Sequence, residues 1–265
     1  MRMKAIASGS SGNSIYVGTD STHILVDTGL SRKKVEAGLN ELNICGNDIN
    51  GILITHEHSD HIGGLGVFLR KYPVPVYATG KTISQILGYK YLGKVDESLF
   101  RPIVYDESFN IGDITVNPIR IRHDAAEPAA YTFEQNGKKS AIVTDLGCYD
   151  DYIVNKLKSL DALFIEANHD VRMLETGPYP YELKKRILGN FGHLSNESCG
   201  KLVDTVLHDN IKHIVLSHLS QENNIPELAY QAVKTEIDLS ETQYRSNDFH
   251  MFVASRYEPS EEINF

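Results

Sequence analysis

The sequence has little of what marks a secreted or membrane-spanning protein. Its three cysteines, Cys45, Cys148 and Cys199, are odd in number, far apart and outside any CxxC spacing. This argues against a disulfide framework and a cysteine-based zinc site, so we expect small buried hydrophobic residues at these positions. No apolar run approaches the roughly 18 residues of a membrane span. The opening MRMKAIASGSSGNS lacks the apolar core of a secretory signal, so a cytoplasmic enzyme is expected.

The chain also lacks an excess of basic residues. Its formal net charge of -9 argues against broad, nonspecific coating of nucleic acid. It does not exclude a local phosphate site, because two divalent cations would place positive charge where a phosphate binds. Repeats, low-complexity tracts and linkers are absent as well. With 41% hydrophobic and 23% charged residues, the composition predicts one globular domain over residues 1–265.

Short strand-like segments alternate with helical ones. Asn136 and Gly137 predict the tip of a β-hairpin in YTFEQNGKKSAIVTD, because this dipeptide supplies the positive φ angles of a type I′ turn. Other strands are expected at KAIAS, SIYVG, HILVD, 51–55, DALFIEAN and HIVLSH, and helices near 33–42, 62–71, 148–158, 180–189, 197–207 and 226–235. The end of the chain, YRSNDFHMFVASRYEPSEEINF, is expected to add a last strand and an acidic tail. This mixture favours an α/β fold with helices on the outer faces of sheets.

The segment ILITHEHSDHIGG concentrates titratable side chains directly after a buried strand. It contains His56, Glu57, His58, Asp60 and His61. Alternation in an extended segment projects the first, third and fifth of these positions to one side, while His61 can come from the first turn of a helix. Imidazole and carboxylate are the usual ligands of zinc and related divalent ions, so the spacing indicates a metal site rather than a solvated loop.

Polar side chains also follow most of the other predicted strands. They are Asp27, His123, Asp145, Glu166, Asn168, His169 and His218. Ligand sites in layered α/β folds lie at strand ends, so these residues are expected to gather at one rim.

At these positions the chain resembles the metallo-β-lactamase-fold hydrolases. The resemblance rests on LVDTG, HEHSDH, His123, VTDLG and LSH, which occur in the expected order over most of the chain. It implies an αββα four-layer sandwich. It also implies that His56, His58 and His123 hold one metal ion, that Asp60, His61 and His218 hold a second, and that Asp145 bridges both.

Such a ligand set is chemically suited to hydrolysis. Two divalent ions, Zn²⁺ or Mn²⁺, can share a bridging hydroxide near neutral pH, with Asp60 and Asp145 in the catalytic centre. Asp27 is expected to accept a hydrogen bond from a ligand histidine or to order the loop around Thr55. Glu57 is expected to face away from the metals.

Two further stretches resemble the YycJ, or WalJ, subfamily, whose members look like 5′ to 3′ DNA exonucleases. They are ASGSSGNSIYVG and residues 165–202. The first places Ser10, Ser11 and Asn13 in a loop whose backbone N–H groups could bind phosphate, although a simple turn is the alternative. It lacks the GxSxG spacing of a serine hydrolase.

GHLSNES lies in the second stretch and places a histidine at the start of a helix. Ser195 or Asn196 can cap this helix, whose positive end favours anions. His193 could therefore steady a phosphate or protonate the leaving oxygen, and His169 is a weaker candidate for a similar role. Lys184, Lys185 and Arg186 form a basic run that is either a solvated face or a contact to the DNA backbone.

The sequence thus favours a metal-dependent phosphodiesterase, expected to be a 5′ to 3′ DNA exonuclease. A small-molecule cyclic phosphodiesterase like PhnP is the main alternative, although the cysteine-rich zinc site typical of that group is missing. A thioesterase like glyoxalase II shares the ligand set, and a noncatalytic metal-bound scaffold is the alternative outside enzymes. Secreted β-lactamases commonly carry Cys in place of Asp145, and the interval from Asp145 to His218 is too short for a β-CASP domain.

Overall fold

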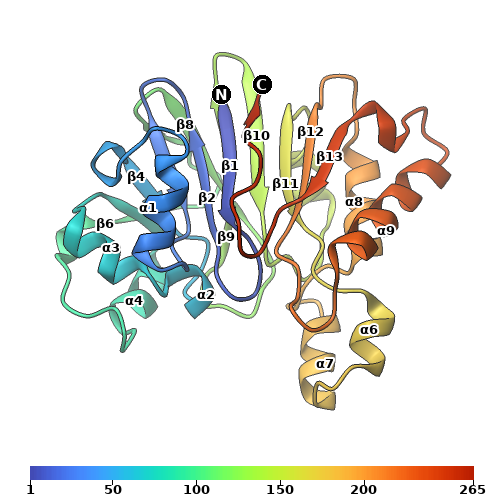
Figure 1. Cartoon of the computed structure of the whole chain (residues 1–265), viewed down its shortest axis with the longest axis horizontal. Helices are drawn as coiled ribbons and strands as arrows, with labels where there is room; N and C mark the ends of the chain where they lie inside the picture. The colour runs from blue at the N-terminus through green and yellow to red at the C-terminus, as the bar shows by residue number, and fades with distance from the viewer. The chain divides into compact units, whose positions relative to one another are not determined.

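Strands rich in Ile, Val and Leu alternate with short helices along the chain (Figure 1). The computed structural model describes residues 1–265. Contacts divide the chain into two compact units. Unit 1 contains residues 1–120, 125–136 and 255–264, and unit 2 contains residues 121–124, 137–254 and 265. A single domain over the whole chain stays a prediction.

Unit 1 is built on a seven-stranded sheet with the order β14-β1-β2-β3-β4-β5-β6. Its strands are β1 (Arg2–Ala7), β2 (Ser14–Gly18), β3 (His23–Val26), β4 (Gly51–Leu53), β5 (Val76–Thr79), β6 (Phe100–Ile103) and β14 (Ile263–Asn264). Pairing is antiparallel from β14 to β3 and parallel from β3 to β6. The sequence predicts a last strand and an acidic tail at the end of the chain. A last strand is present, because the final residues add β14 beside β1.

Three antiparallel strands also belong to unit 1, namely β7 (Phe109–Ile111), β8 (Ile114–Arg120) and β9 (Ala129–Gln135). Asn136 and Gly137 follow β9 with φ angles of 51° and 75°. Both values lie in the left-handed region that a type I′ turn requires, as the sequence predicts.

The helices of unit 1 are α1 (Arg32–Asn40), α2 (Ser59–Ile62), α3 (Leu65–Lys71) and α4 (Gly80–Leu87), with 3₁₀ turns η1 (Gly46–Asp48) and η2 (Glu97–Leu99). Figure 1 shows α1 and α3 beside each other on one face of the seven-stranded sheet. Leu25, Leu39, Ile52 and Phe68 are completely buried in the core of this unit. The helix predicted near 62–71 is present as α3, which begins at Leu65 and is preceded by the separate short helix α2.

Unit 2 contains the parallel strands β10 (Lys138–Val143), β11 (Ala162–Glu166), β12 (His213–Ser217) and β13 (His250–Val253). In the register of these strands, Val143 lies opposite Ile165, and Glu166 lies opposite Ser217. The carboxyl ends of β10, β11 and β12 therefore meet at one edge, which brings together the residues that follow them.

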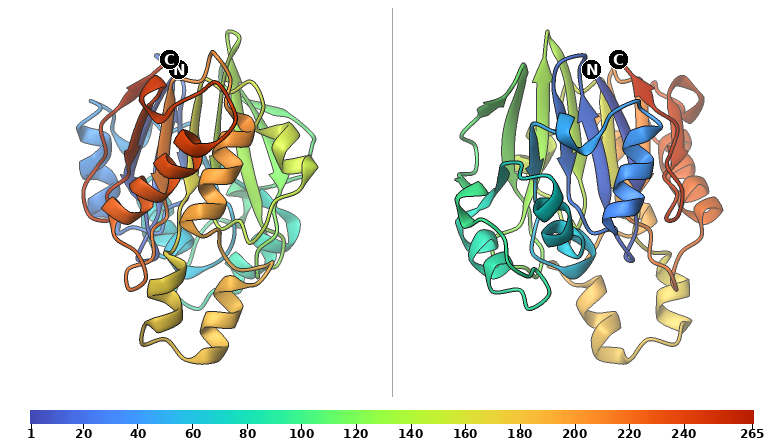
Figure 2. Two further views of the ribbon diagram at one scale, coloured as in Figure 1. Left: turned by 90° about the vertical axis from the view of Figure 1, so that its right-hand side faces the viewer. Right: turned by 60° about the vertical axis from the view of Figure 1, so that its left-hand side comes forward.

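The helices of unit 2 are α5 (Asp151–Lys156), α6 (Val171–Thr176), α7 (Tyr181–Leu188), α8 (Asn196–Val206) and α9 (Pro226–Leu239), with the 3₁₀ turn η3 (Ser246–Asp248). Figure 2 shows α8 and α9 packed against each other beside the strands, whereas α6 and α7 extend away from them. Gly200 permits the close packing of α8 on α9, because a Cβ there would lie 2.8 Å from Cβ of Glu236. None of the helices in the structure combines the length and apolar character needed to cross a bilayer.

Candidate metal centre

Four candidate ligands follow β4 in unit 1. His56 and His58 lie in the extended segment after the strand, whereas Asp60 and His61 lie in α2. The ring of His56 lies 4.1 Å from that of His61 and 4.5 Å from that of His58, measured between centroids. Nε2 of His61 lies 3.3 Å from Oδ2 of Asp60. The prediction that Asp60 continues the strand alternation is wrong, because α2 begins at Ser59.

Asp27 supports this group from the end of β3. Its Oδ2 lies 2.7 Å from Nδ1 of His61 and accepts a hydrogen bond of 2.8 Å from Oγ1 of Thr55. Its Oδ1 accepts a hydrogen bond of 2.9 Å from the backbone N–H of Thr55. Asp27 is 3% exposed, so its carboxylate fixes the His61 ring in a buried setting.

The loop between β1 and β2 reaches the same group through Asn13. The side-chain Nδ2 of this residue lies 3.2 Å from Nε2 of His61 and 3.4 Å from Oδ2 of Asp60. Its Oδ1 accepts a hydrogen bond of 2.9 Å from the N–H of Gly9. Asn13 therefore ties the loop to two candidate ligands.

The serines of this loop are placed differently. Ser10 and Ser11 are exposed, and Oγ of Ser10 accepts a hydrogen bond of 3.1 Å from Arg256. The N–H groups of Gly9, Gly12 and Asn13 are bonded within the protein. These three N–H groups are therefore engaged within the protein, and phosphate binding by the loop at Ser10 and Ser11 stays a prediction.

Asp145 stands at the centre of a second group, in unit 2. Its Oδ1 lies 3.5 Å from Nε2 of His218, 3.6 Å from Nδ1 of His193 and 3.7 Å from Nε2 of His123. Nδ1 of His123 is fixed by the carbonyl oxygen of Gly192 at 3.0 Å. Burial lowers the pKa of His123, which favours the neutral imidazole that binds metals.

Glu166 is the residue that sequence reasoning left without a role. It is completely buried at the end of β11, and its Oε1 accepts hydrogen bonds of 2.6 Å from the N–H of Leu146 and 3.0 Å from that of Leu194. Its Oε2 lies 3.1 Å from Nδ1 of His193 and 3.5 Å from Nδ1 of His218. The signal in the sequence that could have identified this role is the position of Glu166 at the end of a buried strand, among the other polar residues at strand ends.

The electrostatics of this group couple Glu166 to His193. Burial by itself raises the pKa of the Glu166 carboxyl, but the charge and hydrogen bond of His193 and the hydrogen bond of His218 outweigh it and lower the pKa to about 2. Burial opposes the charged form of His193, yet Glu166 and Asp145 raise its pKa above the ordinary value. Glu166 thus holds the His193 ring in one orientation and favours its charged form.

Two residues near His193 have structural partners. Ser195 caps α8 by accepting a hydrogen bond of 3.1 Å from the N–H of Ser198, as one of the two sequence alternatives predicts. His169 pairs with Ser195 in an isolated β-bridge and is 1% exposed. Burial lowers the pKa of His169 to about 4, and neither ring nitrogen makes a hydrogen bond.

Three strand-end residues share an unusual backbone conformation. Asp27, Asp145 and His218 have φ angles of 62°, 57° and 54°. Non-glycine residues in this left-handed region cost about 1 kcal/mol or more, and such strain is typical of functional positions. The sharp turn after each strand places the side chain at the strand end.

Both groups fit divalent metal ions. Buried imidazole rings beside carboxylates lose hydration, and a cation compensates this loss through bonds to nitrogen and oxygen. In unit 2, ligand atoms of Asp145, Glu166, His193 and His218 all lie within 4.8 Å of one another. The three cysteines are free, and only Cys199 is buried, so the expected burial of Cys45 and Cys148 is wrong.

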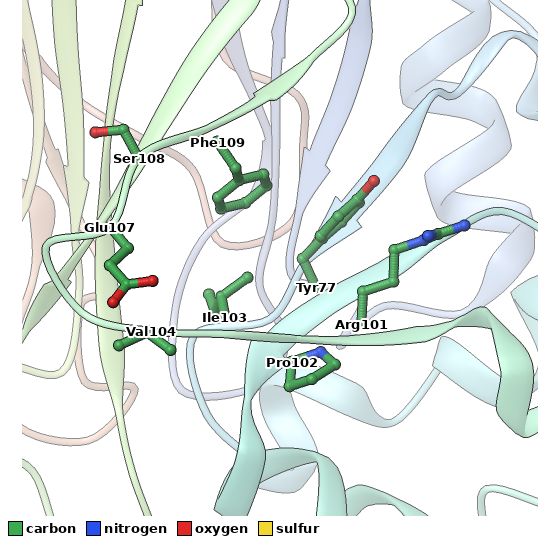
Figure 3. A pocket seen from close by; sticks show the side chains of 8 residues that line it. All are labelled: Tyr77, Arg101, Pro102, Ile103, Val104, Glu107, Ser108 and Phe109. Atoms are coloured by element: carbon green, nitrogen blue, oxygen red, sulfur yellow. The ribbon is translucent and has the colours of Figure 1, made fainter.

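A pocket of about 230 Å³ lies elsewhere in unit 1 (Figure 3). Tyr77 and Phe109 stack in its wall with ring centroids 5.1 Å apart, and Arg101 and Glu107 add one charge of each sign. None of the candidate ligands lines it. We assign it no part in the metal chemistry.

Residues 22–219 match the family model described as the beta-lactamase superfamily domain. The chain belongs to this superfamily. It is 43% identical over 246 residues to exodeoxyribonuclease YycJ of Bacillus anthracis, covering 90% of this chain and 89% of that protein. It is 44% identical over 232 residues to exodeoxyribonuclease WalJ of Streptococcus pneumoniae, covering 88% and 86%.

A solved structure shows the same fold. Zn²⁺-bound PqqB from Methylobacterium extorquens superposes over the full length of both chains with a TM-score of 0.72 at 15% identity. The predicted metallo-β-lactamase fold, an α/β sandwich, is confirmed, as is the subfamily resemblance to YycJ and WalJ.

Proposed function

We propose that this superfamily member is a metal-dependent exodeoxyribonuclease acting from the 5′ end. The observation that carries the proposal is the 43% and 44% identity to two exodeoxyribonucleases over most of each chain. The histidine and carboxylate groups support it, because their donor atoms suit ions that assist phosphodiester hydrolysis.

We further propose two divalent ions, Zn²⁺ or Mn²⁺, since mixed nitrogen and oxygen ligands accept both. The assignment follows the family resemblance: His56, His58 and His123 for one ion, Asp60, His61 and His218 for the other, and Asp145 for both. Such ions supply an activated water and neutralise charge on the phosphate oxygens. The protein's own residues supply orientation and proton transfer.

His193 is proposed to contact the scissile phosphate or to protonate the departing 3′ oxygen. Its Nδ1 faces Glu166 at 3.1 Å, which leaves Nε2 for the substrate. Glu166 is completely buried and is itself held by two backbone N–H groups, so the pair is fixed before substrate binds. This arrangement resembles the orientation of a catalytic histidine by a buried carboxylate.

Incubation with DNA duplexes labelled at the 5′ or the 3′ end, in Mn²⁺ or Zn²⁺, tests the proposal. We expect early release of the 5′ label as a short product. Early release of the 3′ label would reverse the proposed polarity. Turnover of a cyclic phosphodiester with intact DNA would favour the small-molecule phosphodiesterase, and turnover of a thioester alone would favour the glyoxalase II-like alternative.

Two variants test the residue roles. Asp145→Ala is expected to abolish nuclease activity and to lower metal content. His193→Ala is expected to reduce turnover by roughly 10²–10⁴-fold, the usual contribution of general acid–base catalysis, with metal content unchanged. Loss of metal from the second variant would make His193 a ligand and overturn its assignment.

A further inference from the structure

Helices α6 and α7, together with the residues that follow to Phe191, form a projection that we term the helical arm (residues 171–191). Figures 1 and 2 show both helices beyond the carboxyl ends of the unit 2 strands, extending away from them. No residue of α7 is buried. This helix therefore contributes little to the hydrophobic core of unit 2.

One face of α7 exposes large side chains in a regular pattern. Tyr181 is 74% exposed and Leu188 is 47% exposed, and Phe191, just beyond the helix, is 59% exposed. Tyr181, Lys185 and Leu188 follow the i, i+4, i+7 spacing that places them on one side of a helix. With a rise of 1.5 Å per residue, this stripe spans about 10 Å.

The arm does not need this face for its own structure. Nζ of Lys184 donates hydrogen bonds of 2.7 and 2.8 Å to the carbonyl oxygens of Glu175 and Gly177, which join α7 to the end of α6. Arg186 pairs with Asp124. Because these bonds hold the arm in place, the stripe remains available to a partner.

The stripe leads directly into the metal-ligand group of unit 2. The carbonyl oxygen of Phe191 accepts a hydrogen bond of 3.0 Å from the N–H of Asp124, and that of Gly192 holds His123. The N–H of His193 donates a hydrogen bond of 3.0 Å to the carbonyl oxygen of Ile187 in α7. A chain lying along the stripe would therefore arrive at His193.

The charge of the arm favours a polyanion. The arm carries the basic residues Arg172, Lys184, Lys185 and Arg186 and the acidic residues Glu175 and Glu182, in a chain of net charge -9. Arg172 and Lys185 are exposed. Exposed aromatic rings and exposed cations on one surface are the combination that binds single-stranded nucleic acid, through base stacking and phosphate contacts.

We propose that the helical arm is a platform for the single-stranded end of the DNA substrate. Bases stack on Tyr181 and Phe191 while Lys185 and Arg172 contact phosphates. This proposal rests on the proposed exonuclease function and names the surface that delivers the strand to it. It predicts preference for duplexes with a short single-stranded end over blunt duplexes.

The test compares the double variant Tyr181→Ala/Phe191→Ala with the control Tyr91→Ala, whose tyrosine is 70% exposed in unit 1. KM and kcat are measured on overhang DNA, and hydrolysis of bis(p-nitrophenyl) phosphate reports on the metal chemistry alone. The double variant is expected to raise KM for overhang DNA at least about thirtyfold, because the loss of each of the two stacked bases contributes at least about fivefold. Its rate on the small ester and the behaviour of the control are expected to match the unaltered protein.

The salt dependence of KM measures how much the positive charge of Lys185 contributes to DNA binding. Lys185→Ala is expected to reduce the slope of log KM against log salt concentration by about 0.7, the value for one contact to single-stranded phosphate. If the unaltered protein degrades DNA and the double variant keeps its KM, the arm proposal is overturned and a protein becomes the better candidate for the stripe. If the unaltered protein degrades no DNA, the proposed function itself fails.

Discussion

The carboxylate of Asp27 offers the sharpest test of how the protein orients a metal ligand. Its Oδ2 lies 2.7 Å from Nδ1 of His61, while Oδ1 and Oδ2 also accept both hydrogen bonds from Thr55. For Nε2 of His61 to bind a metal, Nδ1 must carry the proton, and Asp27 favours that tautomer. Replacing Asp27 with Asn or with Ala separates this role from simple stabilisation.

Asp27→Asn keeps the shape of the side chain and tolerates the φ of 62° at this position. An amide offers one oxygen and one donating nitrogen, so it cannot accept from both the N–H of Thr55 and Nδ1 of His61, which contact different oxygens of the carboxylate. With its nitrogen toward His61, the ring is driven to the tautomer whose Nε2 is protonated. We expect metal affinity to fall about 10–100-fold, the usual effect of losing such a partner, with a stability loss of only about 1 kcal/mol.

Asp27→Ala is the matched control for stability. It removes the acceptor of the Thr55 N–H and the carboxylate partner of His61 Nδ1, which keeps only Oγ1 of Thr55 at 3.1 Å. Each of these two lost bonds costs about 1–3 kcal/mol. It also places alanine in the left-handed region, at a further cost of about 1–2 kcal/mol. We expect the free energy of unfolding to fall by roughly 3–8 kcal/mol.

Chelator competition for Zn²⁺ or Mn²⁺ measures the metal affinity of both variants, and urea unfolding of the metal-free proteins measures stability. The reasoning predicts a split, with metal affinity lowered in both variants but stability strongly lowered only in the alanine variant. Metal affinity in Asp27→Asn equal to that of the unaltered protein would refute the tautomer argument.

Three more perturbations follow from the structure. Glu166→Gln should lower turnover about 10–100-fold with metal content unchanged, because the amide holds His193 less firmly. Steady-state kinetics together with metal analysis measure this effect. Unchanged turnover would remove Glu166 from the mechanism. Hydrogen bonds from Lys234 and the N–H of Ser246 lower the pKa of Asp238 from 3.8 to about 2. The stability that Asp238 contributes is therefore present above about pH 4 and lost as the pH falls toward 2. Urea unfolding of Asp238→Asn should show a flatter acid dependence over that range, and an identical dependence would contradict the pairing. Chelation should abolish activity. It should also lower the free energy of unfolding by about 2.7 kcal/mol relative to protein in free metal at 100 times its Kd. Calorimetry with and without added Mn²⁺ measures this difference, and equal unfolding curves would exclude a metal site in the folded state.

Local spacing made part of the candidate centre predictable. His56, His58 and His61 lie within one short segment after a buried strand, so their proximity follows from chain geometry alone. The strands that precede Asp145 and His218 are predictable from their unbroken apolar runs. The parallel register then brings the ends of those strands to one edge.

Other features depend on contacts between distant residues. Glu166 gains its role from Leu146 and Leu194, which lie 20 and 28 positions away. The left-handed backbone of Asp145 and His218 is imposed by the turns after their strands, and residue type alone does not predict it for a histidine. Helix α6 is only six residues long and leaves too little periodicity to recognise.

The metal content of the intact protein tests the central claim most directly. Native mass spectrometry after saturation with Mn²⁺ or Zn²⁺ and removal of free metal counts the ions on each chain, in the unaltered protein and in Asp145→Ala. The proposed chemistry predicts two ions per chain and a loss of metal in the variant. A single ion, or two ions that persist when Asp145 is removed, would contradict it.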